Sequence, residues 1–219
     1  MEKFFPVLES CSLFADIRRE DIPGMLQCLG ARPGQATRDQ QLLSEGDAAK
    51  YVGILLSGSA HVVKQDYYGN RSIVARIEPG ELFGESFACA GVAELPVSVV
   101  ANEDCKFLLI DCQRITVSCS NACAFHSQMI FNLLKTVAAR NLEFHQKLEI
   151  TSKRTTREKL MAYLLSQAKA KGSNSFTIPY DRQGLADYLG VERSAMSAEL
   201  GKLRRDGILT TDRSRFTLL

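Results

Sequence analysis

The sequence predicts an α+β protein in which a small antiparallel β-roll is followed by a long helix and then by a winged helix-turn-helix. Three observations predict this order. Short strand-like runs separated by glycines fill residues 38–110, an apolar heptad pattern without glycine or proline covers 121–150, and a basic helix-turn-helix pattern occupies the last third. A length of 219 residues suits such a division, whose boundaries we expect at 1–120, 121–150 and 151–219.

The β segment is defined by turns as much as by strands. Glycines recur about every 11 residues, where a residue that tolerates positive φ lets the chain reverse. The loop at 66–70 contains Gly69 and Asn70, which supply the turn chemistry of a hairpin. Two helices should precede the roll, at 4–9 and 18–29. The expected strands are 51–56, 60–65, 72–77, 97–100 and 106–110.

The helix predicted at 121–150 carries a heptad repeat over three heptads. Such a stripe is typical of a seam between two helices, and a single polar residue in it fixes the register at some cost in stability. We expect a parallel homodimer, with Asn141 as that polar residue. Alternatively the stripe packs on the chain's own β domain, and both arrangements could hold on different faces of the helix. The predicted seam consists of Ile130, Leu134, Val137, Asn141, Phe144 and Leu148.

The last third of the chain reads as helix, tight turn, helix and hairpin. A helix at 157–170 stops at Gly172, and a short strand follows at 176–179. Asp181 should cap a helix at 182–189, and Gly190 should turn the chain into a second helix at 192–205 that stops at Gly207. The runs 208–210 and 215–218 then form a wing. Apolar contacts should brace the two helices through Leu185, Ala186, Leu189, Met196 and Leu200.

Charge and helix periodicity together indicate a DNA-binding surface. Residues 151–219 hold 13 Lys or Arg against 7 Asp or Glu, whereas 1–150 hold 14 against 18. The start of the second helix should enter a major groove, where Arg193 can bind a guanine edge and Ala198 offers a methyl group. The base-reading candidates are Arg193, Ser194, Ser197 and Ala198, and the phosphate-binding candidates are Arg182, Gln183, Lys202, Arg213 and Arg215. The alternative is a solvated basic face on a protein-interaction module.

Composition excludes several other classes of protein. A hydrophobic share of 45% and a charged share of 24% are typical of globular domains. No run approaches the roughly 18 apolar residues that a membrane span needs, and the N-terminus lacks the pattern of a secretory signal. Seven cysteines, an odd number, are expected to be free thiols. We therefore expect a cytoplasmic protein with no membrane contact and no disulfides.

The whole architecture resembles the Crp/Fnr family of bacterial transcription regulators. The resemblance rests on the segments LSEGD at 43–47, LSGS at 56–59, PGELFGE at 79–85 and DRQGLADYLGV at 181–191, with Arg193 and Ser194 after the last. It implies a double-stranded β-roll of the cyclic-nucleotide-binding type, a jelly roll that senses an effector. It also implies a homodimer that binds a near-palindromic operator in double-stranded DNA, with RNA polymerase as a further partner.

The expected effector is where this sequence departs from the family. Relatives that bind cyclic nucleotides place an arginine and a serine about ten residues after the position of Glu85, whereas Leu95 and Pro96 stand here. No Lys or Arg lies between Arg76 and Lys106, so the phosphate would lack a cation from this loop. Cyclic AMP is not expected, and Gly84 and Glu85 would serve only the turn and helix capping. The pocket should be empty or hold a small apolar effector, without any cofactor, among Phe83, Gly84, Glu85, Leu95, Pro96, Val97, Phe144 and His145.

Redox, haem and metal chemistry remain as weaker hypotheses. Cys11 and Cys28 are 17 residues apart, which does not suit an iron–sulfur cluster, but a thiol switch at Cys119 or Cys123 stays open. Relatives that sense haem use a Cys and a His near the position of Gly84, and no histidine of this sequence is close to it. A cupin-like metalloenzyme would need paired ligands, whereas the three histidines are isolated, so we expect no metal site and no enzyme activity. The three histidines are His61, His126 and His145.

Overall fold

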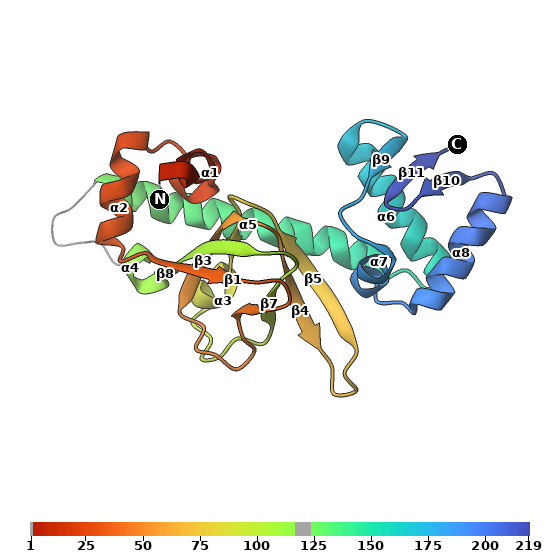
Figure 1. Cartoon of the computed structure of the whole chain (residues 1–219), viewed down its shortest axis with the longest axis horizontal. Coiled ribbons are helices and arrows are strands. Elements are labelled where there is room, and N and C mark those ends of the chain that lie inside the picture. Colours follow the sequence, from red (N-terminus) through yellow and green to blue (C-terminus); the bar gives the residue numbers. More distant parts are fainter. Residues whose placement is uncertain (1, 117–123) are drawn as a thin grey trace. The chain divides into compact units, whose positions relative to one another are not determined.

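A computed structural model describes residues 2–116 and 124–219 (Figure 1). These residues divide into two compact units. Among the described residues, the first comprises 2–70, 74–116 and 124–141, and the second comprises 71–73 and 142–219. The first unit contains the β-roll except for the first three residues of one strand, and the second contains the helix-turn-helix and its wing. The predicted fold class is confirmed.

The roll consists of two four-stranded sheets whose described pairings are all antiparallel. One sheet has the order β1 (Arg32–Ala36), β8 (Cys105–Asp111), β3 (Tyr51–Ser57) and β6 (Leu82–Phe83). The other has the order β2 (Gln41–Leu43), β7 (Ser98–Ala101), β4 (Ala60–Gln65) and β5 (Arg71–Ile77). The five strands expected from the sequence are β3, β4, β5, β7 and β8, and their ends shift by one residue at most.

The hairpin between β4 and β5 is closed by a side chain. One carboxylate oxygen of Asp66 accepts hydrogen bonds from the backbone N–H groups of Tyr68 and Asn70, at 2.9 and 2.8 Å. Gly69 follows with a φ of 83°, which an L side chain adopts only with strain. The expected turn at 66–70 is confirmed, and its sequence sets its geometry.

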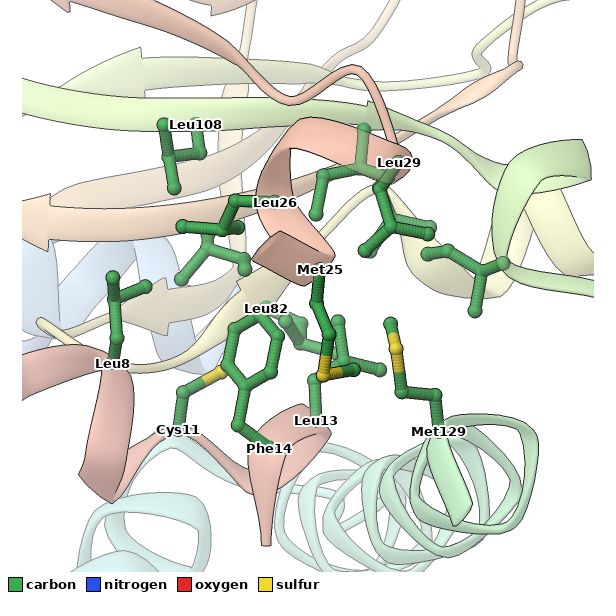
Figure 2. Close-up of a cluster of buried hydrophobic side chains, with 14 of the residues drawn as sticks. Leu8, Cys11, Leu13, Phe14, Met25, Leu26, Leu29, Leu82, Leu108 and Met129 are labelled. Atoms are coloured by element: carbon green, nitrogen blue, oxygen red, sulfur yellow. The ribbon is translucent and has the colours of Figure 1, made fainter. Parts of the chain in front are cut away.

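Two apolar clusters form the core of the first unit. One lies inside the roll, where the rings of Phe83 and Phe107 meet edge to face with centroids 6.0 Å apart. A Cβ at Gly53 would lie 2.1 Å from the Phe83 ring, so this position requires glycine. The other cluster packs the roll against the N-terminal helices and α5, as Figure 2 shows for Met129 beside Met25. The helices around the roll are α1 (Phe5–Ser10), α2 (Ile22–Cys28), α3 (Glu85–Ala90), α4 (Cys112–Thr116) and α5 (Ala124–Thr151).

The predicted helix at 18–29 is shorter than expected. Its first part is a single 3-10 turn at Arg19–Asp21, and α2 begins only at Ile22. Pro23 lies in the first turn of α2, where its missing N–H and fixed φ favour a helix start. Two further 3-10 turns, at Glu2–Phe4 and Ser12–Phe14, flank α1.

The long helix α5 buries one face on its own unit between residues 124 and 141. Met129 and Leu133 lie in the core, and the buried Asn132 amide donates to the carbonyls of Leu13 and Ala15 at 3.0 and 2.8 Å. Five of the six predicted seam residues are exposed in the single chain: Ile130, Leu134, Asn141, Phe144 and Leu148. The sixth, Val137, is half-buried against the core, so it belongs partly to the packed face.

The second unit contains the expected helices and a three-stranded antiparallel sheet of order β10, β11, β9. Asp181 accepts a hydrogen bond from the Gly184 N–H at 2.7 Å, which confirms the predicted cap. Gly190 and Gly207 have φ values of 61° and 69° where the two helices end. The elements are α6 (Thr156–Lys171), β9 (Ser175–Thr177), α7 (Arg182–Leu189), α8 (Arg193–Arg205), β10 (Leu209–Asp212) and β11 (Arg215–Leu218).

Candidate nucleic-acid interface and effector site

The helix-turn-helix is held by a small apolar core. The five bracing residues predicted from the sequence are at most 4% exposed, and Leu203 on α8 is buried with them. On α8 the buried positions are Met196, Leu200 and Leu203, whose spacing of four and three residues places them on one face of the helix. The opposite face of α8 is therefore turned to solvent.

That solvent face brings together all four base-reading candidates. Arg193, Ser194, Ser197 and Ala198 are exposed and lie within the first two turns of α8. Arg193 is the first residue of the helix. A helix that presents an arginine, two hydroxyls and a methyl group at its N-terminal end has the chemistry needed to read base edges.

The phosphate candidates fall into two groups. Arg213 and Arg215 are exposed on the wing, where Arg213 occupies the turn with a φ of 47°. Lys202 and Gln183 are exposed on the helices, but each is engaged by a neighbouring carboxylate. The Lys202 ammonium lies 2.6 Å from Glu199, and the Gln183 amide donates to the Asp187 carboxylate at 2.7 Å. Binding a phosphate through Lys202 therefore competes with a local ion pair.

Arg182 has a structural role that the sequence does not reveal. It is half-buried, its guanidinium lies 5.1 Å from the centre of the Phe216 ring, and it donates to the Thr211 hydroxyl at 2.7 Å. Burial lowers the pKa of Arg182, and the nearby charge of Arg204 lowers it further. The residue thus ties α7 to the wing and holds a second cation close to Arg204.

The effector candidates on the roll are largely packed into its core. Phe83, Leu95 and Val97 are at most 8% exposed and belong to one apolar cluster. The position expected to hold a phosphate-binding arginine is therefore filled by the buried side chain of Leu95. Gly84 has a φ of 77°, and a Cβ there would lie 2.9 Å from the Tyr51 carbonyl oxygen, so glycine is required.

Glu85 has a buried cationic partner that sequence spacing did not reveal. Its carboxylate is 3.6 Å from the Arg140 Nε, and both residues are buried. Arg140 belongs to α5, and it also donates to the Leu82 carbonyl at 3.2 Å. The expectation that Glu85 serves only the turn and helix capping is therefore wrong. The ion pair joins the start of α3 to α5. The only feature of the sequence that could have indicated this partner is an arginine beside the heptad stripe.

A second cation also reaches the loop that lacks Lys and Arg in sequence. The Lys64 ammonium, from β4, donates to the Pro96 carbonyl at 2.7 Å and to the Glu45 carboxylate. Because β4 and β7 are paired, this residue lies beside the loop although it is 32 positions away. Both Arg140 and Lys64 have a carboxylate partner of their own, so both cations of this site are already engaged in ion pairs.

The remaining candidates are placed as follows. Phe144 and His145 belong to the second unit and are exposed, so their part in the pocket stays a prediction. Cys119 and Cys123 lie outside the described residues. Within the described ranges, no group of three or more His, Cys, Asp or Glu side chains could hold a metal ion. Over those ranges too, no helix has the length and apolar character needed to cross a membrane.

Comparison with known families agrees with this geometry. A model of the cyclic nucleotide-binding domain matches residues 33–119, and a model of the Crp-like helix-turn-helix domain matches residues 158–219. A roll of this kind joined to a helix-turn-helix defines a DNA-binding transcription regulator. The chain belongs to the Crp/Fnr family of bacterial transcription regulators, as its sequence motifs suggested.

Individual relatives cover most of the chain at low identity. The nitrogen fixation regulation protein FixK of Azorhizobium caulinodans is 24% identical over 194 residues, which are 85% of this chain and 75% of that protein. The structure of FixK2 from Bradyrhizobium japonicum matches with a TM-score of 0.66 and 21% identity, over 86% of this chain and 92% of that one. The c-di-GMP-responsive regulator CLP of Xanthomonas campestris matches with a TM-score of 0.73 and 17% identity, over 90% and 98%. These structures establish the fold.

Proposed function

We propose that the protein is a homodimeric regulator that binds a near-palindromic operator through α8. The observation that carries this proposal is the solvent face of α8, where Arg193, Ser194, Ser197 and Ala198 lie together beside a basic wing. The regulator acts in the cytoplasm, has RNA polymerase as a further partner and catalyses no reaction. Two relatives that match most of the chain are a nitrogen fixation regulation protein and a transcriptional activator protein.

The exposed stripe of α5 supports the dimer. Leu134 is 64% exposed and Leu148 is 62% exposed, and Ile130 and Phe144 are exposed at the other heptad position of the stripe. Large apolar side chains repeated along one stripe of a helix favour burial against a second copy. Asn141 lies exposed within the stripe, where pairing with its counterpart would fix the register.

The buried core of the roll supports a signal other than a cyclic nucleotide. A cyclic phosphate needs a cation or several amide donors that are not already engaged. Leu95 fills the arginine position, while Arg140 and Lys64 are paired with Glu85 and Glu45. The roll therefore holds an apolar effector or none at all.

Selection from random DNA duplexes tests the proposed function. The expected result is an enriched motif with two related half-sites about one helical turn apart, because a twofold dimer presents two copies of α8. Arg193→Ala should relax the preference at one base pair, whereas the control Arg213→Ala should weaken all sequences alike. If no motif is enriched, the basic face serves a protein partner instead and the proposal fails.

A further inference from the structure

Two cysteines far apart in sequence meet beside the Glu85 ion pair. The Sγ atoms of Cys89, on α3, and Cys112, on α4, are 3.8 Å apart, within hydrogen-bonding distance for sulfur. Cys89 is exposed, whereas Cys112 is 6% exposed. The Cys112 N–H donates to the Lys50 carbonyl at 2.9 Å, which fixes the start of α4. The Cys89 thiol is therefore accessible to solutes, and the buried Cys112 thiol is in contact with it.

The separation is close to what a disulfide requires. An S–S bond is about 2.05 Å long, so the two sulfurs must approach by roughly 1.8 Å. Cys89 lies in the last turn of α3, and Gly91 ends that helix with a φ of 66°. Rotation about the Cα–Cβ bond of a cysteine moves its sulfur while the helix backbone stays in place.

The other described cysteines are placed differently. Cys11 is buried, and burial raises the pKa of its thiol to about 11, which disfavours the reactive thiolate. Cys105 is also buried, and its thiol is engaged by the carbonyls of Ser59 and Glu103 at 3.2 Å. Cys28 is exposed and provides a matched solvent-accessible thiol. The pairing thus distinguishes Cys89 and Cys112 from these three.

We propose that Cys89 and Cys112 are a redox modification site that hydrogen peroxide converts to a reversible disulfide. The thiolate of one cysteine attacks a peroxide oxygen, the O–O bond breaks, and hydroxide leaves as water with the released thiol proton. The second thiol then attacks the sulfenic sulfur, which forms the S–S bond and releases a second water. The two thiols together lose two electrons and two protons to one peroxide.

The contact between the two thiols supplies the thiolate. The hydrogen bond from the Cys89 thiol lowers the pKa of Cys112 and raises that of Cys89, so the pair ionises first at Cys112. Cys112 is therefore the thiolate that attacks the peroxide. Cys89, the exposed thiol, then serves as the resolving thiol.

The site lies on the helix that carries Glu85. Cys89 follows Glu85 by four residues, so the two side chains leave α3 one turn apart. A disulfide would tie α3 to α4 at one end, while the Arg140 ion pair holds the other end to α5. The proposal concerns the first unit alone and does not depend on what the protein binds.

Peptide mapping of the full-length protein tests this site. The reduced protein is treated with hydrogen peroxide, quenched with acid, alkylated in denaturant and digested. We expect two of the seven cysteines to escape alkylation and to appear as one Cys89–Cys112 linked peptide, which dithiothreitol removes. Cys89→Ser should abolish the linked peptide, and because Cys89 is exposed this variant should keep the fold.

Cys28→Ser is the control, since Cys28 is exposed but has no role in the proposed pair. The linked peptide should form in this variant at the wild-type rate. Oxidation of Cys28 in the wild-type protein before any Cys89–Cys112 link appears would overturn the proposal. A link from Cys112 to a different cysteine would overturn it as well.

Discussion

Replacing Arg140 by methionine should destabilise the first unit strongly. The change keeps an apolar chain of similar length and removes the cation 3.6 Å from the Glu85 carboxylate. Glu85 is 3% exposed, so water cannot replace the lost partner, and the Leu82 carbonyl also loses its donor. Breaking a buried ion pair on one side costs about 3–5 kcal/mol. For a unit of this size the melting temperature should fall by roughly 10 °C.

A double variant separates the ion pair from simple loss of packing. Glu85→Gln together with Arg140→Met removes both charges, so it should be more stable than Arg140→Met alone. Arg18→Met is the matched control, because Arg18 pairs with Asp21 at the surface and its side chain is 71% exposed. That control should cost about 1 kcal/mol or less. Scanning calorimetry of thermal unfolding gives the melting temperature of each of the three variants. Equal melting temperatures for Arg140→Met and the control would refute this reasoning.

Three further predictions concern the dimer, the effector and pH. Leu134→Glu should convert the dimer to a monomer in sedimentation. Ala138→Glu should not, because Ala138 is exposed on the same helix but lies outside the stripe. If both variants remain dimers, the interface lies elsewhere. Titration calorimetry with cyclic AMP and cyclic GMP should show no binding, since Leu95 fills the cation position, and micromolar affinity for either would contradict the proposed signal. Lys147 donates to the Ile73 carbonyl and lies 4.4 Å from the centre of the Tyr188 ring, and burial lowers its pKa from 10.5 to about 8. Between these two pKa values the unfolded chain binds more protons than the folded chain, so the free energy of unfolding rises with pH. From pH 7.5 to 9.5, denaturant titrations should show the free energy of unfolding of the wild type rising by about 2 kcal/mol relative to that of Lys147→Met. A difference between the two proteins that stays constant with pH would exclude the titration of Lys147.

The order of the elements was predictable because local chemistry and tertiary packing agree. Glycines mark the reversals of the roll, and Asp181 and Gly190 set the ends of the helices in the helix-turn-helix. Strand β1 escaped prediction because Pro33 and Gly34 are poor strand residues. It forms through pairing with β8, where the absence of a side chain at Gly34 makes room for the Phe107 ring. Short strands of this kind depend on partners that local patterns do not show.

The two candidate sites differ in how far sequence could predict them. The face of α8 follows from helix periodicity, since the buried Met196 and Leu200 determine which side chains point outward. The partners of the effector site do not follow from any spacing. Arg140 meets Glu85 across 55 positions, and Lys64 meets Pro96 across a sheet. Such pairs depend on three-dimensional packing, and they change the electrostatics that sequence spacing had suggested.

Binding to an operator obtained by selection tests the central claim most directly. Sedimentation of wild-type protein with a fluorescent operator duplex, at one fixed salt concentration, gives both affinity and stoichiometry. The account predicts two chains per duplex, binding at least about 1000-fold tighter than to a scrambled duplex, and a loss of about 1–3 kcal/mol for Arg193→Ala on the operator alone. One chain per duplex, or equal affinity for operator and scrambled DNA, would contradict it.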